Sequence, residues 1–376
     1  MSRIVLPPRP RILVVVLRRL GDVLLTTPLI HSLRAAWPQA RIDALVFADT
    51  AAILDGNPDL DSVIAMPQGG SFMQSLALAA KLWRRYDLAI STQTGDRPTF
   101  FTLIAGRKRA GPLRARLSGR LIRPLYDRVL SGQNATHRVQ ENLQLAELIG
   151  IPPLPQMVTP FAALSETIAP ARPYAVIHAA PFLRYKRWHM QGWRDVARAL
   201  AERGLEIVAT GGPAAEECRY LDSIWNDAPV AVRRLDGRLS WPELAALLAG
   251  ARAYVGPDTS VTHLAAGANC PTVALFGPTD PRLWGPWPRD GLMSPWQASG
   301  QIQQRGNVWL VQNPLPCLPC QQEGCLRRFD SHSQCLDELP SSQVIAALDQ
   351  ALALSAGRLP AAAASQQAGA DGRRPL

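Results

Sequence analysis

The sequence lacks the patterns that mark several large classes of protein. Nowhere do its 376 residues form an apolar run near the roughly 20 residues needed to cross a bilayer. The opening segment, MSRIVLPPRP, has no long hydrophobic region and no small-residue cleavage site, so we expect no secretory leader. A Ser–His–Asp order, an H-E-x-x-H motif and a P-loop are all missing. These absences argue against an integral membrane protein, a secreted protein and the enzymes that those motifs define.

Lysine is also scarce, with only Lys81, Lys108 and Lys186 among the 40 basic residues. A GC-rich genome is one explanation of such an arginine bias; the other is that each of the few lysines fills a role that arginine cannot. Against 30 acidic residues the net charge is +10, which favours an anionic partner: nucleic acid, a membrane surface or a phosphorylated substrate. Hydrophobic residues make up 47%, so the chain is long and apolar enough for two or three globular domains.

Most of the excess charge comes from one stretch. Between Arg107 and Arg128 lie eight basic residues against the single acid Asp127, a net +7. Two interpretations stay open: a solvated helix face with its flanking loop, or a surface that docks phosphate groups, which arginine binds in a bidentate way. Tyr126 is the only aromatic residue of the stretch. Because base stacking needs aromatic rings, nucleic acid is the weaker candidate for the anionic partner.

Short apolar, β-branched runs alternate with segments of helical periodicity along the first part of the chain. A helix is expected from Val23 until Pro38 ends it, and a second helix around 75–85. Such alternation predicts a parallel sheet with helices on both faces. The strands that we expect in this sheet are 11–17, 41–47, 62–66 and 88–91.

The alternation starts again after a segment with six prolines, 151–173. The expected strands there are 174–178, 205–210, 253–255 and 272–276, and the expected helices are 193–203, 241–249 and 261–266. Two α/β halves joined in this way predict a ligand cleft between them, facing the carboxyl ends of the strands. We therefore divide the chain into a tail 1–10, a first domain 11–160, a linker 161–173, a second domain 174–354 and a disordered tail 355–376.

Two single residues lie at turns that follow a strand. Asp22, after Gly21, is either a helix N-cap or a general base that projects into the cleft. The turn lacks G-x-G-x-x-G, so it is not a dinucleotide-binding fingerprint. Lys186 lies in the segment R-Y-K-R-W, which is either an anion site at the cleft or a solvated loop.

The segment Gly256-Pro257-Asp258-Thr259-Ser260 follows a strand and opens a helix. A helix N-terminus offers free N–H groups and the positive end of its dipole, which suits a phosphate group. Thr259 and Ser260 add hydroxyl donors, although capping alone also explains Asp258 and Thr259. His263, one turn further, is either a buried structural histidine or a ligand.

Four motifs in register across both halves resemble bacterial lipopolysaccharide heptosyltransferases, glycosyltransferase family 9. They are L-G-D-V-L-L-T-T-P-L, K-R-W after a strand, G-G-P, and P-D-T-S-V-T-H-L-A-A-G followed by V-A-L-F-G-P-T-D-P. The resemblance spans about 11–348. It implies a GT-B fold of two Rossmann-like, doubly wound domains. It also implies metal-independent, inverting transfer of heptose from ADP-heptose to the inner core of the lipid A-linked oligosaccharide.

The resemblance also implies roles for individual residues. Asp22 matches the general base, Lys186 the lysine at the donor phosphates, and Asp258 the acid that holds heptose hydroxyls. Glu216 loosely matches a ribose-binding acid and Leu239 an adenine contact. The group at the pyrophosphate is Thr259, Ser260, Val261 and His263. For the acceptor phosphates or anionic lipid head groups, the candidates come from the basic stretch: Arg107, Lys108, Arg109 and Arg114.

Four of the six cysteines fall late in the chain, with the spacing of a possible structural zinc site: Cys317, Cys320, Cys325 and Cys335. Without a secretory leader, such spacing favours reduced thiols or metal over disulfides. Zinc, an iron–sulfur cluster and unliganded thiols stay open as alternatives. Cys218 and Cys270 are interpreted as single core or surface residues.

The favoured hypothesis is a peripheral enzyme on the cytoplasmic face of the inner membrane, with a nucleotide-sugar donor and a lipid A-core acceptor. One alternative is a related GT-B transferase that uses another donor or acceptor. A remote alternative is a basic, zinc-bearing protein that binds nucleic acid, although no nucleic-acid motif is present.

Overall fold

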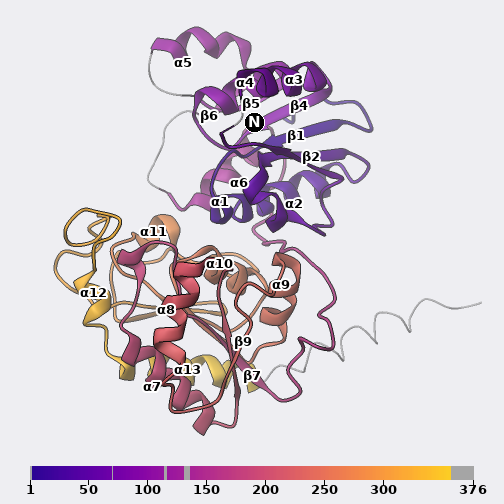
Figure 1. Ribbon diagram of the computed structural model, residues 1–376. Helices are drawn as coiled ribbons and strands as arrows, with labels where there is room; N and C mark the ends of the chain where they lie inside the picture. The colour runs from indigo at the N-terminus through magenta and orange to yellow at the C-terminus, as the bar shows by residue number, and fades with distance from the viewer. Residues whose placement is uncertain (1, 70, 114–116, 131–135, 357–376) are drawn as a thin grey trace, which may run out of the picture. The chain divides into compact units, whose positions relative to one another are not determined.

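The computed structural model describes residues 2–69, 71–113, 117–130 and 136–356. The chain divides into two compact units, Met1–Phe161 and Ala162–Leu376. Each unit contains its own sheet with helices around it (Figure 1). Within the described part of the chain, no helix has both the length and the apolar character needed to cross a membrane.

The N-terminal unit is built on a parallel sheet with the strand order β3-β2-β1-β4-β5-β6. Because the strand order reverses between β1 and β4, the carboxyl ends of these two strands form a topological switch point, where ligands bind in open α/β sheets. The strands are β1 (Arg11–Val15), β2 (Arg41–Phe47), β3 (Ser62–Met66), β4 (Tyr86–Ser91), β5 (Gly106–Pro112) and β6 (Arg128–Leu130).

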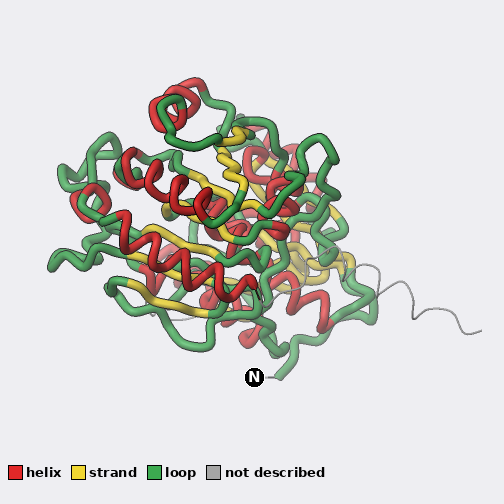
Figure 2. The backbone as a smooth tube through the Cα atoms, turned by 90° about the horizontal axis from the view of Figure 1, so that it is seen from below, coloured by secondary structure: helices red, strands yellow, loops and turns green. Residues whose placement is uncertain are grey.

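Helices cover both faces of this sheet. Leu29 and Leu33 of α2 and Leu145 of α6 are buried in one core, and Ala79 and Phe101, from α3 and α4, are buried in the other. Figure 2 shows the strands as yellow segments between red helices. The helices are α1 (Leu20–Leu24), α2 (Thr27–Ala36), α3 (Phe72–Leu82), α4 (Asp96–Ala105), α5 (Leu117–Ile122) and α6 (Arg138–Leu148), with 3₁₀ turns η1 (Ala48–Leu54) and η2 (Arg123–Leu125).

The helix expected from Val23 to Pro38 is in fact two helices. It breaks after Leu24, and α2 begins at Thr27 with Pro28 in its first turn. Proline has no backbone N–H to donate, so a first helical turn accommodates it where a helix interior does not. At the break, the hydroxyl group of Thr26 donates to the carbonyl oxygen of Asp22 at 2.8 Å.

The C-terminal unit is built on a second sheet, with the order β12-β13-β11-β10-β7-β8-β9. All pairs are parallel except β12 with β13, and the order reverses between β7 and β10. The prediction of mainly parallel sheets is confirmed for both units. The strands are β7 (Tyr174–His178), β8 (Glu206–Thr210), β9 (Val232–Arg234), β10 (Ala253–Pro257), β11 (Thr272–Leu275), β12 (Ile302–Arg305) and β13 (Val308–Val311).

Around this sheet lie η3 (Arg184–Lys186), α7 (Met190–Glu202), α8 (Ala215–Trp225), α9 (Trp241–Gly250), α10 (Ser260–Gly267), α11 (Pro281–Trp284), α12 (Gln334–Asp337) and α13 (Ser341–Ala356). The last helix packs Val344, Ala347 and Leu348 into the main core. Since α13 runs through Ala356, the predicted tail is helical at its first two positions, and the rest of it lies outside the described residues.

The proline-rich segment begins as an extended arm on the N-terminal unit. Ile151 and Met157 are buried there. The Leu154 N–H donates to Ser32 Oγ at 2.8 Å, and the Val158 N–H donates to Thr27 Oγ1 at 3.2 Å. The contacts of residues 151–161 therefore belong to the first compact unit.

Candidate functional site

Asp22 lies at the switch point of the N-terminal sheet, in the first turn of α1 after β1. Its side chain is 9% exposed, and its Oδ1 atom lies 3.4 Å from Nε of Arg138. The alternative that Asp22 is an N-cap is wrong, because α1 begins at Leu20 and Arg19 occupies the N-cap position. The structure therefore holds a nearly buried carboxylate at the carboxyl edge of the sheet.

Arg138 comes from the start of α6 and is nearly buried as well. It pairs with Glu141 at 2.8 Å and donates to the carbonyl oxygen of Thr92, which follows β4, at 2.9 Å. Burial raises the pKa of the Asp22 carboxyl, and the charges of Arg138, Arg18 and Arg19 offset only part of that rise. A carboxylate with a raised pKa is a better proton acceptor near neutral pH than an ordinary aspartate.

A small cavity of about 40 Å³ opens beside Arg138 at this edge. That volume admits a water molecule or a small polar group. The Arg18 guanidinium donates to Gln93 Oε1 at 3.0 Å, and the Gln93 amide donates to the carbonyl oxygen of Leu17 at 2.8 Å. The cavity is lined by Arg18, Thr92, Gln93, Thr94, Pro112, Leu130, Arg138, Glu141, Gln144 and Leu145. Its polar lining suits a hydroxyl-rich or anionic group.

The C-terminal unit carries a second site at the switch point between β7 and β10. Lys186, in the turn after β7, places Nζ 2.6 Å from Oδ2 of Asp258, which directly follows β10. The Lys186 and Asp258 side chains are 19% and 8% exposed. Burial alone raises the pKa of Asp258, but the charges of Lys186 and His263 and hydrogen bonds from Lys186 and Thr279 outweigh it, so the pKa is lowered overall.

Helix α10 starts at this ion pair. Thr259 is its N-cap and accepts a hydrogen bond from the Thr262 N–H at 3.4 Å, while Ser260 and Val261 form the first two helical positions. The buried hydroxyl of Tyr254 lies 2.9 Å from that of Thr262, which fixes the helix start to β10. The N–H groups of a first turn lack intrahelical partners, and with the Thr262 N–H capped by Thr259, those of Ser260 and Val261 are available to an anion.

His263 lies one turn into α10 and is buried. Burial lowers the pKa of its imidazole to about 4, with Asp258 raising it and Lys186 lowering it further. The ring is therefore neutral at pH 7, and its buried Nδ1 has no hydrogen-bond partner in the described part of the chain. The structure thus brings together six predicted donor-site residues: Lys186, Asp258, Thr259, Ser260, Val261 and His263.

The two loosely matched residues follow neighbouring strands of this sheet: Glu216 lies in the first turn of α8, after β8, and Leu239 lies in the loop after β9. The Gly237 N–H after β9 donates to the carbonyl oxygen of Gly211 after β8 at 2.8 Å, and Leu239 follows two residues later. The Glu216 side chain is 82% exposed and lies 3.7 Å from Arg187. Glu217, by contrast, accepts from the Gly212 N–H at 2.5 Å and so shapes the glycine loop. Sequence reasoning missed Glu217, although it directly follows Glu216.

The predicted acceptor residues Arg107 and Lys108 are not next to Asp22. Arg107 and Lys108 lie near the amino end of β5, whereas Asp22 follows the carboxyl end of β1. Arg109 uses its guanidinium to bind the carbonyl oxygens of Leu103, Gly106 and Leu125, which is a structural role. Arg114 lies outside the described residues.

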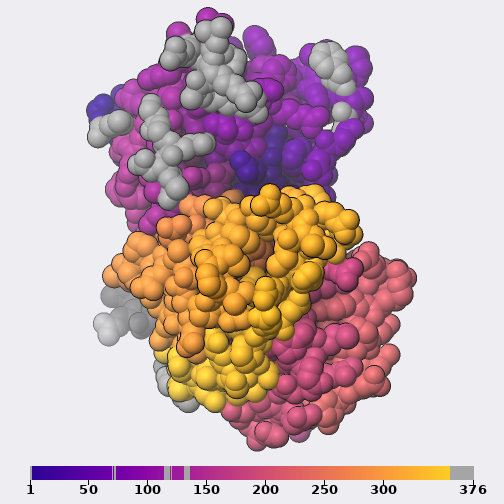
Figure 3. Space-filling model, turned by 90° about the vertical axis from the view of Figure 1, so that its left-hand side faces the viewer, coloured from indigo at the N-terminus to yellow at the C-terminus, as the bar shows by residue number. Residues whose placement is uncertain are grey.

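The late cysteines lie in a segment that contributes to the outer surface of the C-terminal unit, orange to yellow in Figure 3. Cys335 is buried, and burial together with the thiols of Cys320, Cys325 and Cys317 raises its pKa to about 12. The Gln334 N–H lies 3.4 Å from Sγ of Cys325. All these cysteines are free, and across the described ranges no three His, Cys, Asp or Glu side chains are arranged to hold a metal ion. The geometry therefore does not support the predicted zinc site.

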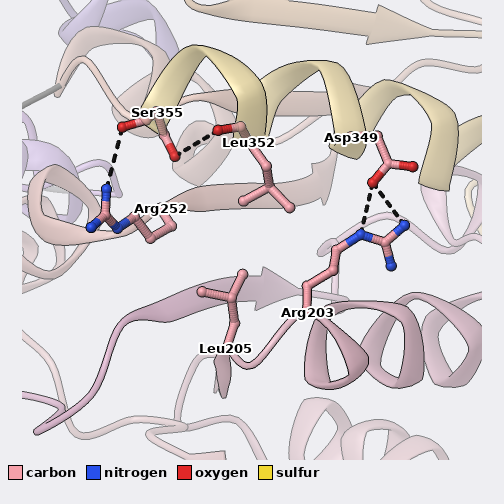
Figure 4. Close-up of a pocket in the computed structure, with 6 residues that line it drawn as sticks. All are labelled: Arg203, Leu205, Arg252, Asp349, Leu352 and Ser355. Atoms are coloured by element: carbon pink, nitrogen blue, oxygen red, sulfur yellow. Dashed lines mark hydrogen bonds and ion pairs between the residues drawn. The ribbon is translucent and has the colours of Figure 1, made fainter. Parts of the chain in front are cut away.

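A larger cavity, of about 510 Å³, lies in the C-terminal unit beside α13 (Figure 4). Its charged groups are already engaged: Arg203 pairs with Asp349 at 2.7 Å, and Arg252 donates to the carbonyl oxygen of Ser355 at 3.3 Å. Leu205 and Arg252 directly precede β8 and β10, so this cavity lies at the amino edge of the sheet, opposite the edge that carries Asp258.

Two doubly wound α/β units, each with polar side chains at the switch point of its sheet, define an α/β protein of the GT-B class. A family model, glycosyltransferase family 9 (heptosyltransferase), matches residues 75–307. The chain belongs to this family, as the motifs predicted, and is a glycosyltransferase.

Individual relatives agree with this assignment. The chain is 30% identical over 356 residues to lipopolysaccharide heptosyltransferase 1 of Pseudomonas aeruginosa, with 89% of this chain and 92% of the relative covered. It is 28% identical over 354 residues to lipopolysaccharide heptosyltransferase 3 of Escherichia coli K12, covering 88% and 95%. The solved E. coli heptosyltransferase WaaC with ADP-2-deoxy-2-fluoro heptose has a similar fold, with a TM-score of 0.66, 21% identity and coverage of 90% and 99%. The predicted GT-B fold is confirmed.

Proposed function

We propose that this glycosyltransferase moves heptose from ADP-heptose to the inner core of lipopolysaccharide, with inversion and without a metal ion. The observation that carries the proposal is the Lys186–Asp258 pair at the start of α10, 2.6 Å apart. This place combines a cation, a carboxylate that can accept hydrogen bonds from sugar hydroxyls, and the free N–H groups of a helix start. The names of the relatives, which are lipopolysaccharide heptosyltransferases, supply the sugar and the acceptor class, and the solved WaaC structure with ADP-2-deoxy-2-fluoro heptose supplies the nucleotide.

In the proposed reaction an acceptor hydroxyl attacks the anomeric carbon of the heptose. Asp22 takes the proton of that hydroxyl, a new C–O bond forms, and the bond from the anomeric carbon to the diphosphate oxygen breaks. ADP leaves with the electron pair, and a single displacement inverts the anomeric centre. The nearly buried carboxylate with its raised pKa supports the role of Asp22 as the base.

Negative charge develops on the departing diphosphate, and the donor site has groups suited to that charge. The Lys186 ammonium and the N–H groups at the start of α10 provide fixed positive charge, and Thr259 and Ser260 provide hydroxyls. Preorganised donors of this kind stabilise a transition state without reorganisation cost. Because these groups can supply the charge compensation, the proposed step does not require a divalent cation.

A donor screen tests the proposed function directly. ADP-heptose, UDP-sugars and GDP-sugars are each incubated with the protein and lipid A-type acceptors, and release of nucleotide is measured. We expect release from ADP-heptose alone, and only when an acceptor is present. Acceptor-dependent release from a UDP- or GDP-sugar, with none from ADP-heptose, would instead favour the related GT-B transferase.

We expect the acidic limb of the pH profile to depend on Arg138. The charge of Arg138 lowers the pKa of Asp22, so Arg138→Met raises that pKa and leaves less base at low pH. The acidic limb of the kcat/KM profile should move to higher pH in this variant. Arg138→Lys keeps the positive charge, so it should shift the limb less. Arg9→Met, an exposed change, is the control. An equal loss of kcat/KM at every pH contradicts this role for Arg138.

The zinc site stays a prediction with a direct test. If the four late cysteines bind zinc, the purified protein contains about one equivalent per chain, because four thiolates complete one tetrahedral site. The variant Cys320→Ser then loses that metal, whereas Cys218→Ser, outside the cluster, retains it. Metal analysis of the unchanged protein and the two variants decides the question. Absence of zinc from all three would show that the cysteines do not form a zinc site.

We also propose that the enzyme works as a peripheral protein on the cytoplasmic face of the inner membrane. The lipid A anchor of the proposed acceptor and the basic net charge of +10 support this placement.

A further inference from the structure

Much of the solvent-facing side of α3 is apolar, and its exposed polar residues are Gln74 and Lys81. The exposed positions Met73, Leu76, Ala77 and Ala80 recur three and four residues apart, which places them on one helix face. Met73 is 68% exposed, Leu76 48%, and Trp83, just after the helix, 66%. A surface helix normally turns charged residues outward, so this face is unusual for a helix that meets only water.

Exposed apolar side chains continue beyond α3 on the same layer. Helices α3 and α4 contact each other and lie side by side in Figure 1. On α4, Phe100 is 41% exposed. Arg109 binds the carbonyl oxygens of Leu103 in α4 and Leu125 in η2, which holds the exposed Leu125 next to α4. We call the side chains of Met73, Leu76, Trp83, Phe100 and Leu125 the apolar face.

Basic residues border the apolar face at the end of α3. Lys81, Arg84 and Arg85 are exposed. The Arg84 N–H donates to the carbonyl oxygen of Ile104 at 2.8 Å, which fixes this turn to the end of α4. Tyr86 pairs with Gly106, so the exposed Arg107 flanks the same sheet edge as Arg85. Over residues 62–126 the sequence has eleven basic residues and only two acidic ones.

We propose that the apolar face binds a bilayer that carries anionic lipids. Trp83 and its apolar neighbours would enter the boundary between head groups and acyl chains, where tryptophan is enriched, while the basic residues contact lipid phosphates. A second copy of this chain fits less well, because a symmetric contact through this face brings its basic border against itself. The proposal rests on the proposed function, because an enzyme whose acceptor is anchored in a membrane by lipid must meet that acceptor at the membrane surface.

The topology links this surface to the chemistry. Helix α3 follows β3, so its first turn, with Met73, starts from the same carboxyl edge of the sheet that carries Asp22. A bilayer on α3 therefore lies against the unit that holds the proposed base, with Met73 toward the edge that carries Asp22 and Trp83, just before β4, toward the opposite edge. Docking there keeps a membrane-anchored acceptor within reach of the unit that must deprotonate it.

The test measures co-sedimentation of the full chain with vesicles of phosphatidylcholine alone or mixed with phosphatidylglycerol. We expect at least about tenfold stronger binding to the mixed vesicles, reduced by salt, because of the phosphate contacts. The double variant Leu76→Ser/Trp83→Ser should lose at least tenfold of that binding, since each buried CH₂ group contributes about 0.8 kcal/mol. Met293→Ser is the control: it also replaces an apolar side chain by serine, at a 96% exposed residue of the other unit, and should bind as the unchanged protein does.

A second readout separates this proposal from the proposed function. The double variant should transfer heptose normally to a water-soluble acceptor without acyl chains, and several-fold more slowly to an acceptor embedded in the mixed vesicles. Suppose that neither the unchanged protein nor the double variant transfers heptose, but vesicle binding depends on Leu76 and Trp83. The proposed function is then wrong and the proposed docking surface is supported. Unchanged vesicle binding in the double variant overturns the docking surface.

Discussion

Replacing Asp22 by Asn is expected to lower kcat by about 10²- to 10⁴-fold, the usual contribution of a general base. The amide keeps the shape of the side chain but cannot take the proton of the attacking hydroxyl. Affinity for ADP should stay near that of the unchanged protein, because the donor groups belong to the other unit. Nucleotide release gives kcat, and calorimetric titration with ADP gives the affinity.

Asp59→Asn is the matched control for this variant. Asp59 is also a buried aspartate of the N-terminal unit, paired with His31 at 2.9 Å, but it lies just before β3, at the amino edge of the sheet. It should retain activity, which separates loss of the base from the general effect of removing a buried charge. Full activity of the Asp22→Asn variant would show that Asp22 is not the general base.

Replacing Lys186 by Met should weaken ADP-heptose binding and lower kcat by about 10²- to 10³-fold, as loss of one fixed donor does at a site of developing charge. Stability should fall too, by about 3–5 kcal/mol, because the buried carboxylate of Asp258 is left unpaired. Thermal unfolding and nucleotide release measure the two effects separately.

The double variant Lys186→Met/Asp258→Asn distinguishes the two roles of the pair. It removes both charges, so it should recover much of the lost stability without recovering activity. Recovery of activity would show that Lys186 serves only to neutralise Asp258.

The same pair predicts how stability depends on pH. The lowered pKa of Asp258 means that its contribution is fully present above the unfolded value of about 3.9 and is lost as pH falls through the lower folded value. The unchanged protein should therefore lose this contribution on acidification. Lys186→Met, which lacks the pair, should show a flatter acidic profile of unfolding free energy.

The sequence predicted those parts of the fold that depend on local pattern. Runs such as RILVV and YAVIH are apolar and β-branched, and both became buried parallel strands. The two strands from Ile302 onward were missed: β12, IQQR, is mostly polar, and β13, VWLV, is an apolar run of only four residues that follows it after a two-residue turn. The helix break at Thr26 was missed because the hydrophobic period continues across it, whereas Pro28 in the same segment was the available signal.

The sequence could predict the part of the site in which two residues follow strands that lie next to each other in the sheet. Lys186 and Asp258 are 72 positions apart, but β7 and β10 are adjacent and bring the turns after them together. Arg138 carried no such signal, because it follows a short strand at the far edge of the sheet and reaches Asp22 only through the packing of α6. Long-range packing of this kind leaves no spacing that a single sequence reveals.

The arm of residues 151–161 sets a limit on how far the two halves of the enzyme can separate. Because the arm is fastened to the N-terminal unit at Ser32 and Thr27, only residues 162–173 remain between it and the first strand of the second sheet. Those twelve residues reach at most about 40 Å when fully extended. The unit that carries Lys186 and Asp258 is therefore tethered to the unit that carries Asp22 by a linker of at most this length.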